Sequence, residues 1–277
     1  MLVALTELVD FMGDDSLTTN SIFTALHSEV EGVVKSYCNR AFESASYIME
    51  RYDGDGGRYL FLKQYPVTAL DRLAIGTQDI IRIKNTNVYT TASVSVTSTG
   101  LRLVKDRTAT TTVLFSSSTT MSAVVTAVNA ISGWSAELLS SLYSSWKSNE
   151  LITMYGRNVI DNNYVYLSTP YDAEDNFDLD LATGRIYKAS GFAWGISNIF
   201  VDYTAGYATI PDDLQHAVKI FIKTVWDKKT SETWNLRRYT IGDITYEFGA
   251  GGSSSQQSIS MPIEVLSILS KYRKRLV

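Results

Sequence analysis

The stretch VDYTAGYATIPDDLQHAVKIFIKTVWDKK, residues 201–229, changes its pattern midway, at Pro211. Before the break, β-branched and aromatic residues lead to Gly206, which can take a backbone angle that other residues avoid. After it, apolar residues recur at the three-and-four spacing of one helix face. Pro211 suits the first helical turn, where Asp212 and Asp213 complement the helix dipole. The stretch therefore predicts a strand, a glycine corner and an amphipathic helix, and none of its residues is an obvious nucleophile, acid or ligand. The predicted apolar face consists of Leu214, Ala217, Val218, Phe221, Ile222 and Val225.

The composition is that of a globular chain with room for two domains. The 277 residues are 45% hydrophobic and 19% charged, and 17 Tyr with 5 Trp favour strands and contact surfaces over disorder. The net charge of -4 argues against binding of nucleic acid through a positive charge spread over the whole protein. The single cysteine, Cys38, excludes an internal disulfide. The N-terminal residues do not have the pattern of a signal peptide, and no segment approaches a membrane-spanning length.

Hydrophobic periodicity divides the chain into helical ends and a strand-rich middle. Two helices are expected near the start, the second of them carrying Phe23, Val30 and Val34 on its apolar face, and strands follow from residue 47 to 75. The segment 77–190 is rich in Ser and Thr, with four short strand-like runs, IIRIKN, VYTTASVSV, LRLVKD and TVLFS. A helix with an apolar face is expected after them, ending at Gly133; its face comprises Met121, Val124, Val125, Val128 and Ile131.

After the helix of the opening stretch, the pattern indicates one more strand, a linker and a last helix. The strand is RYTIGDITYEF, from Arg238 to Phe248. GAGGSSSQQS, residues 249–258, has the composition of a flexible linker. Pro262 then starts an amphipathic helix with a basic end. We therefore expect the chain to finish in a helix that is tethered loosely to the rest.

Several groups of residues could have a chemical function, but a structural role explains each group more simply. DGDGG at Asp53–Gly57 has the first acidic positions of a calcium loop, but Gln64 stands where a bidentate Glu is needed, so a hairpin turn is favoured. The acidic run from Asp172 to Asp180 could hold a hard cation or supply paired carboxylates, but such runs are usually solvated loops. The two histidines, His27 and His216, have no ligand neighbours at suitable spacing. No nucleophile elbow, phosphate loop or dinucleotide motif is present. We expect no enzyme activity, no metal and no cofactor.

Five phrases, in this order, resemble the head-to-tail connector, or adaptor, proteins of tailed bacteriophages. They cover most of 4–75 and 198–229, together with a terminal helix, and the part between them looks like an insertion. The phrases are LTELVDFMGDD with SIFTALHSEVEGVVKSYCNRAF, YDGDGGRYLFL, QYPVTALDRLAI, VDYTAGYATIPDDLQHAVKIFI and IEVLSILSKYRKR.

The resemblance implies an α+β fold and a structural function. A small helical core with short strands would comprise residues 1–76 and 191–248, interrupted by a β-rich inserted domain at 77–190 and followed by the linker and a helix at 259–277. The family implies a ring, commonly of twelve copies, docked on the portal protein in the virion and contacting a downstream neck or tail protein. Double-stranded DNA would pass through the ring without specific binding, because an acidic wall repels phosphates. The insertion could enlarge the outer wall, contact neighbouring proteins or carry decoration.

The terminal helix is the candidate binding element. Its apolar face must be covered, and we expect a partner, either the adjacent subunit or the portal, to cover it; the alternative is that the helix folds back on its own subunit. Removal of residues 259 to 277 would then leave the stability of the isolated chain nearly unchanged. The expected partner-binding residues are Val265, Leu266, Leu269, Tyr272, Arg273, Lys274 and Arg275.

Two other function classes stay open from the sequence. A metal-dependent hydrolase would use the acidic run at 172–180, and a carbohydrate-binding or adhesin module would use the Ser- and Thr-rich middle as a β-domain. Both predict a sugar or metal ligand and no portal partner.

Overall fold

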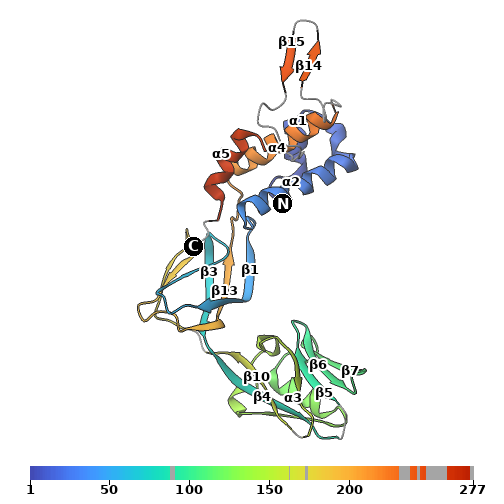
Figure 1. Ribbon diagram of the computed structural model, residues 1–277, viewed down its shortest axis with the longest axis vertical. Helices are drawn as coiled ribbons and strands as arrows, with labels where there is room; N and C mark the ends of the chain where they lie inside the picture. Colours follow the sequence, from blue (N-terminus) through green and yellow to red (C-terminus); the bar gives the residue numbers. More distant parts are fainter. Residues whose placement is uncertain are drawn as a thin grey trace.

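The computed structural model describes residues 1–87, 91–161, 163–171, 174–230, 238–241, 244–247 and 261–274. Helices and small antiparallel sheets are segregated along an elongated molecule, which confirms the expected α+β class. Figure 1 shows helices near one end, a sheet in the middle and a second sheet-containing unit at the other end. Within the described residues, no helix is long and apolar enough to cross a membrane.

Helices from both ends of the chain form one helical body. Asn20 caps its second helix by accepting hydrogen bonds from the backbone N–H groups of Ile22 and Phe23. All six residues of the apolar face expected in the opening stretch are buried here, as predicted. The helices are α1 (Leu5–Met12), the 3-10 turn η1 (Asp15–Thr19), α2 (Ser21–Cys38), α4 (Asp212–Thr230) and α5 (Ile263–Tyr272). A two-stranded hairpin of β14 (Arg238–Ile241) and β15 (Ile244–Glu247) extends beyond them, where the sequence predicted one strand.

The central sheet follows the helical body and has the order β1-β13-β3, all antiparallel. Its middle strand ends at Ala205, and Gly206 turns the chain at φ 113° toward α4. A Cβ atom at Gly206 would lie 2.3 Å from the carbonyl oxygen of Glu43, so the predicted glycine corner is confirmed. A small sheet of order β11-β12-β2 shares a core with it. The strands are β1 (Ala45–Gly54), β2 (Tyr59–Phe61), β3 (Val67–Ile75), β11 (Asp178–Asp180), β12 (Arg185–Tyr187) and β13 (Gly195–Ala205).

The outer unit consists of two sheets and one helix around a separate hydrophobic cluster. The sheets have the orders β7-β6-β5-β9 and β10-β4-β8, and helix α3 packs against β8 and β7. The four predicted strand runs correspond to β4 to β7. The predicted helix is present but ends at Asn129, and Gly133 lies in the turn that follows it. The elements are β4 (Thr77–Asn85), β5 (Ala92–Val96), β6 (Gly100–Lys105), β7 (Ala109–Leu114), α3 (Met121–Asn129), β8 (Trp134–Leu138), the 3-10 turns η2 (Ser141–Tyr143) and η3 (Ser148–Glu150), β9 (Met154–Asn158) and β10 (Val165–Pro170).

The end of the sequence-predicted insertion lies in a different sheet from the rest of it. Strands β11 and β12 fall within 77–190, yet β12 pairs with β2 and Ile186 is buried in the core of the central sheet. Tyr171, by contrast, directly follows β10, whose register pairs Pro170 with Thr77. The chain therefore leaves the outer unit close to where it enters it, well before residue 190.

Candidate assembly surfaces

Helix α5, the expected partner-binding element, lies on the helical body of its own chain. Val265 and Leu269 are fully buried in the same cluster as residues of α2 and α4. The carbonyl oxygen of Leu269 is 3.7 Å from Sγ of Cys38, and the backbone N–H of Lys274 donates to the carbonyl oxygen of Cys38 at 2.9 Å. This corrects the expectation that a partner covers the apolar face of the helix, because α2 and α4 of the same chain cover it.

Tyr272 anchors the end of α5. Its hydroxyl donates to Oδ1 of Asp213 at the start of α4, and its ring packs edge-on against Phe42 and Tyr207 at 6.0 and 6.5 Å between centroids. Burial, and then the hydrogen bond to Asp213, raise the pKa of the phenol, so Tyr272 stays neutral and a hydrogen-bond donor. Tyr272 is therefore an internal contact of the helical body.

The remaining predicted binding residues have mixed positions. Leu266 is half-buried, and Arg273 is exposed with its guanidinium 5.6 Å from the centroid of the Tyr37 ring. Lys274 is half-buried, and burial lowers the pKa of its ammonium group. Arg275 lies outside the described residues, as does the predicted linker 249–258. Of the expected set, Leu266 and Arg273 remain placed to contact a partner.

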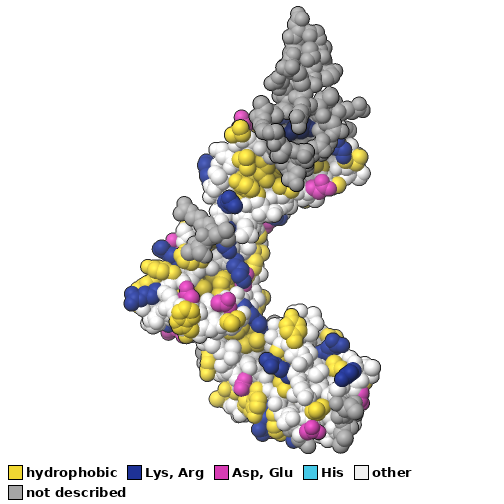
Figure 2. Space-filling model, viewed as in Figure 1, with side chains coloured by type: hydrophobic (Ala, Val, Ile, Leu, Met, Phe, Trp, Pro, Cys, Tyr) yellow, Lys and Arg dark blue, Asp and Glu magenta, His cyan; other side chains and the backbone are white. Residues whose placement is uncertain are grey.

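An apolar groove runs along α2 on the surface of the helical body. The groove is open to solvent and has a volume of about 660 Å³. Figure 2 shows hydrophobic side chains gathered on the helical body in this view. The groove is lined mainly by apolar side chains of α2 and α4, among them Leu26, Val30, Val33, Phe221 and Val225.

Helix α2 also has exposed apolar side chains. Val33 and Ile22, both on α2, expose 41% and 52% of their surface although they are apolar. Large apolar residues exposed beside a groove are typical of contact surfaces. The groove is therefore the candidate assembly surface of the helical body.

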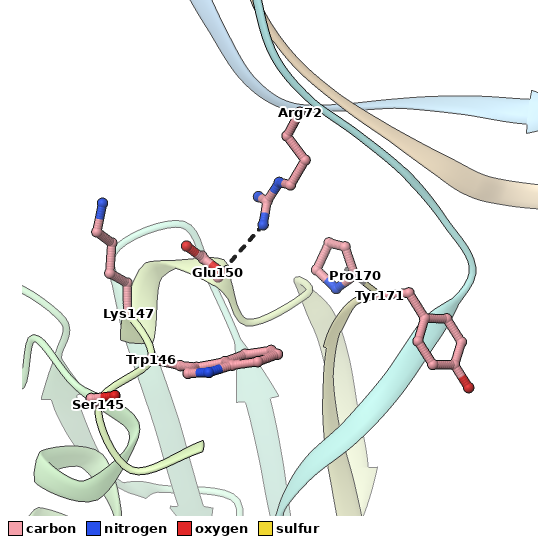
Figure 3. Close-up of a pocket in the computed structure, with 7 residues that line it drawn as sticks. All are labelled: Arg72, Ser145, Trp146, Lys147, Glu150, Pro170 and Tyr171. Atoms are coloured by element: carbon pink, nitrogen blue, oxygen red, sulfur yellow. Dashed lines mark hydrogen bonds and ion pairs between the residues drawn. The ribbon is translucent and has the colours of Figure 1, made fainter. Parts of the chain in front are cut away.

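A second cavity, of about 290 Å³, lies where the central sheet meets the outer unit. Arg72 of β3 donates through Nε to Oδ2 of Asp202 at 2.9 Å, and its Nη1 lies 3.2 Å from Oε2 of Glu150 in the outer unit. Figure 3 shows Arg72 directed toward Glu150, with the Trp146 ring lying below the pair and the Tyr171 ring directed away from it. One guanidinium thus joins the two parts of the molecule.

Neither Arg72 nor the buried carboxylate of Glu31 belongs to a motif that sequence reasoning could detect. Glu31 accepts hydrogen bonds from the backbone N–H groups of Leu2 and Val3, at 2.5 and 3.1 Å, and lies 3.2 Å from Nε2 of His27. Burial raises the pKa of Glu31, but the close contact with His27 and the two backbone hydrogen bonds outweigh it and hold the pKa below its ordinary value. The spacing of His27 and Glu31 on one helix face was the only available clue, since the backbone partners lie far away in sequence.

The other chemical candidates have structural contacts. Asp53 accepts a hydrogen bond from the backbone N–H of Ser197, and Asp55 accepts one from Gly57, within the turn that follows β1. His216 packs edge-on against Phe11, and Cys38 is buried, which raises the pKa of its thiol to about 11. These contacts position the backbone and the helices rather than a reacting group.

The acidic run does not gather at one point. Glu174 pairs with Lys188 at 3.1 Å, and Asp180 accepts hydrogen bonds from Thr183 and the backbone N–H of Ala182. Asp172 lies outside the described residues. In the part of the chain that the structure describes, no three His, Cys, Asp or Glu side chains are grouped to hold a metal ion.

Comparison with known proteins found similarity to solved structures. No family model matches the sequence, and no curated protein matches it. Among solved structures, the chain is similar to one from the neck of a native GTA particle computed with C12 symmetry, with 13% identity and a TM-score of 0.41, covering 100% of this chain and 91% of that chain.

Two further structures share the likeness. The neck of an empty GTA particle computed with C6 symmetry gives 12% identity and a TM-score of 0.40, covering 100% of this chain and 91% of that chain. The virion of a native gene transfer agent (GTA) particle gives 13% identity and a TM-score of 0.33, covering 94% and 80%.

Proposed function

We propose that this chain is a structural head-to-tail adaptor of a tailed-bacteriophage type of particle. It would form a ring in the virion, with twelve copies, docked on the portal protein, and would extend the channel through which DNA leaves. Its free side would provide the platform for a downstream neck or tail protein. The role is mechanical and needs no catalytic group.

One observation carries the proposal. The two stretches whose sequence resembles the adaptor family, 4–75 and 198–229, are far apart in the chain, yet they pack as one helical body and one central sheet. Helix α5, from the last of the resembling phrases, joins the same core. The phrases are separate in the sequence, so their meeting in space is an independent reason to treat them as one unit.

We also propose that residues 77–171 form the inserted domain. The outer unit has its own hydrophobic cluster, and its first and last strands pair side by side, Thr77 opposite Pro170. Such a unit can be added to a core without disturbing it, since both ends of the insertion meet at one place. The boundary at 171 replaces the one at 190, because β11 and β12 belong to the core that remains.

The test is to mix the purified chain with its portal protein and to image the product by electron microscopy. Rings seated on the portal are expected, and particles made with the tagged chain should carry the tag at the neck. A matched sample without portal shows whether the ring needs the portal to form. A chain that stays monomeric with the portal, is absent from particles and binds a sugar or a divalent cation instead would overturn the proposal in favour of an adhesin or hydrolase.

A further inference from the structure

The segment that leads into β13 has two large apolar side chains in solvent. Trp194 exposes 81% of its surface and Ile196 exposes 90%. Neither side chain belongs to a hydrophobic cluster of the described residues. Single exposed apolar residues are common, but a tryptophan next to an isoleucine on one loop is typical of a contact surface. The loop 193–197 is therefore a candidate for binding another protein.

The turn that follows β1 holds this loop in one conformation. The side chain of Asn198 accepts a hydrogen bond from the N–H of Gly54 and donates one to the carbonyl oxygen of Ala193, both at 2.9 Å. A Cβ atom at Gly56 would overlap Nε1 of Trp194, so the indole lies directly against the backbone of the turn. A side chain that is already fixed loses little entropy on binding, which favours a role in recognition.

Two carboxylates lie in the same turn. Asp53 accepts a hydrogen bond from the N–H of Ser197 at 2.5 Å, and Asp55 accepts one from the N–H of Gly57 at 2.8 Å. Both carboxylates belong to exposed residues. An anionic membrane surface repels such a loop, whereas a protein pocket with a basic group attracts it. The charges therefore favour a protein partner with an apolar pocket and a nearby cation.

The outer unit has a pocket with these properties. The pocket lies between β9 and β10, has a volume of about 410 Å³ and is lined mainly by apolar side chains, those of Ile152, Met154, Val165 and Tyr166. Among the described residues that line it, Arg157 carries the charge, and this residue is exposed. Pockets of about 300 to 1,000 Å³ accept drug-sized ligands, so this one has room for an indole ring.

The pocket and the loop lie near the same end of β1. Arg51 of this strand donates through Nη2 to Oγ1 of Thr153 at 2.7 Å, and Thr153 also lines the pocket. Asp53 follows Arg51 by two residues. The loop does not fill the pocket of its own chain, since Trp194 and Ile196 are exposed. A contact between two different patches of identical chains is head-to-tail, and it gives a ring when the rotation closes.

We infer that Trp194 and Ile196 of one copy occupy the pocket between β9 and β10 of the next copy, with Asp53 and Asp55 facing Arg157. This contact rests on the proposed ring. Burial of the two apolar side chains stabilises it, and the opposite charges orient it. Each copy has one loop and one pocket, so every loop is occupied in a closed ring.

The first test removes the apolar side chains of the loop. Trp194→Ser combined with Ile196→Ser should leave the melting temperature nearly unchanged, because both side chains lie outside the core. The concentration needed for rings to form on the portal should rise about tenfold or more. Leu142→Ser, at an apolar residue of the outer unit with 78% exposure, is the matched control and should assemble normally. Normal assembly of the folded double variant would overturn the inference.

The second test uses a photoreactive side chain and does not depend on the serine variants. Ile196 is replaced by benzoylphenylalanine, and unlabelled and isotope-labelled chains are mixed, assembled on the portal and irradiated. Mass spectrometry should find cross-links between copies that end within residues 152–168 of the neighbour. Leu142 replaced in the same way should give no link to that segment.

The cross-linked products also separate the inference from the proposed function. A link from position 196 to the portal protein, or to another segment of the neighbouring copy, would overturn the inference while the ring stands. Absence of rings from the unmodified chain would overturn the proposed function, and the inference with it.

Discussion

Glu43 is a carboxylate that joins the N-terminus of the chain to helix α2. It accepts hydrogen bonds from Nζ of Lys35 and from the amino group of Met1, both at 2.5 Å. Burial raises the pKa of Glu43, but these hydrogen bonds outweigh it and lower the pKa to about 2. The folded protein therefore favours the ionised form of this side chain.

This predicts a specific loss of stability in acid. A carboxyl group with a depressed pKa contributes stability that is fully present above its unfolded value, near 4.5, and is lost as the pH falls toward 2. Glu43→Gln should lower the melting temperature at neutral pH and flatten its decline over that range. Glu29→Gln, an exposed change on helix α2, is the control. Parallel acid melting curves for Glu43→Gln and the unmodified chain would contradict the assignment.

The junction residue Arg72 gives a second prediction. Glu150→Gln removes the charge that Arg72 meets in the outer unit, while Asp202 still holds the guanidinium in the central sheet. A partly exposed ion pair contributes little, so we expect a change in unfolding free energy of about 1 kcal/mol or less. Hydrogen exchange should nevertheless rise near Glu150. The control is Glu137→Gln, whose partner Arg82 lies within the outer unit; equal exchange in both variants would count against a joining role.

At the scale of elements, helix α5 differs most from the expectation based on sequence, because it packs against its own chain. Leu269→Ala empties a fully buried position and should cost about 2 to 4 kcal/mol of unfolding free energy. Leu266→Ala, on the half-buried side of the same helix, should cost about 1 kcal/mol or less. Truncation of 259–277 should likewise destabilise the isolated chain, contrary to the expectation from sequence. Chemical denaturation measures all three, and equal effects of the two leucine changes would contradict the packing.

The elements differ in how far the sequence could predict them, and the differences have physical reasons. Helix α4 was predicted with its whole buried face, because an apolar pattern at three-and-four spacing over that length is typical of a helix with one buried side. Strand β9, MYGRN, was missed because it is an exposed edge with no alternation to detect. For α5 the pattern identified an apolar face, but a sequence does not say which surface covers a face. The groove that receives Leu269 is built by residues distant in the chain.

For the whole molecule, the two possible C-terminal boundaries of the insertion, at residues 171 and 190, lead to opposite predictions. Replacing 77–171 by a short Gly-Ser loop should leave a cooperatively folded remainder, because the N–H of Tyr171 donates to the carbonyl oxygen of Gly76 and the ends are adjacent. Replacing 77–190 also removes Ile186 from the core of the central sheet and should disrupt it. Thermal unfolding followed by circular dichroism compares the two. Equal cooperativity in both deletions would show that the boundary is not at 171.

The arrangement of the whole molecule was predictable in outline only. The helical ends and strand-rich middle were visible as shifts of pattern, and so was the existence of an insertion. The contact between Arg72 and Glu150 was not, because neither residue stands in a motif and the fold alone brings them together. The same holds for β12, whose short run RIY does not reveal that its partner is β2.

The origin of the helical body from both ends of the chain has a consequence for synthesis on the ribosome. Helices α1 and α2 emerge first, but α4, which covers Phe23, Val30 and Val34, follows only after residues 39–211. At about 5 to 20 residues per second, that interval lasts on the order of 10 to 30 s. The strands of the outer unit are contiguous in the chain, so this unit can fold during that time. The apolar face that α4 later covers stays exposed until then. An unfinished chain therefore lacks a complete helical body, so only full-length products are able to enter the assembly.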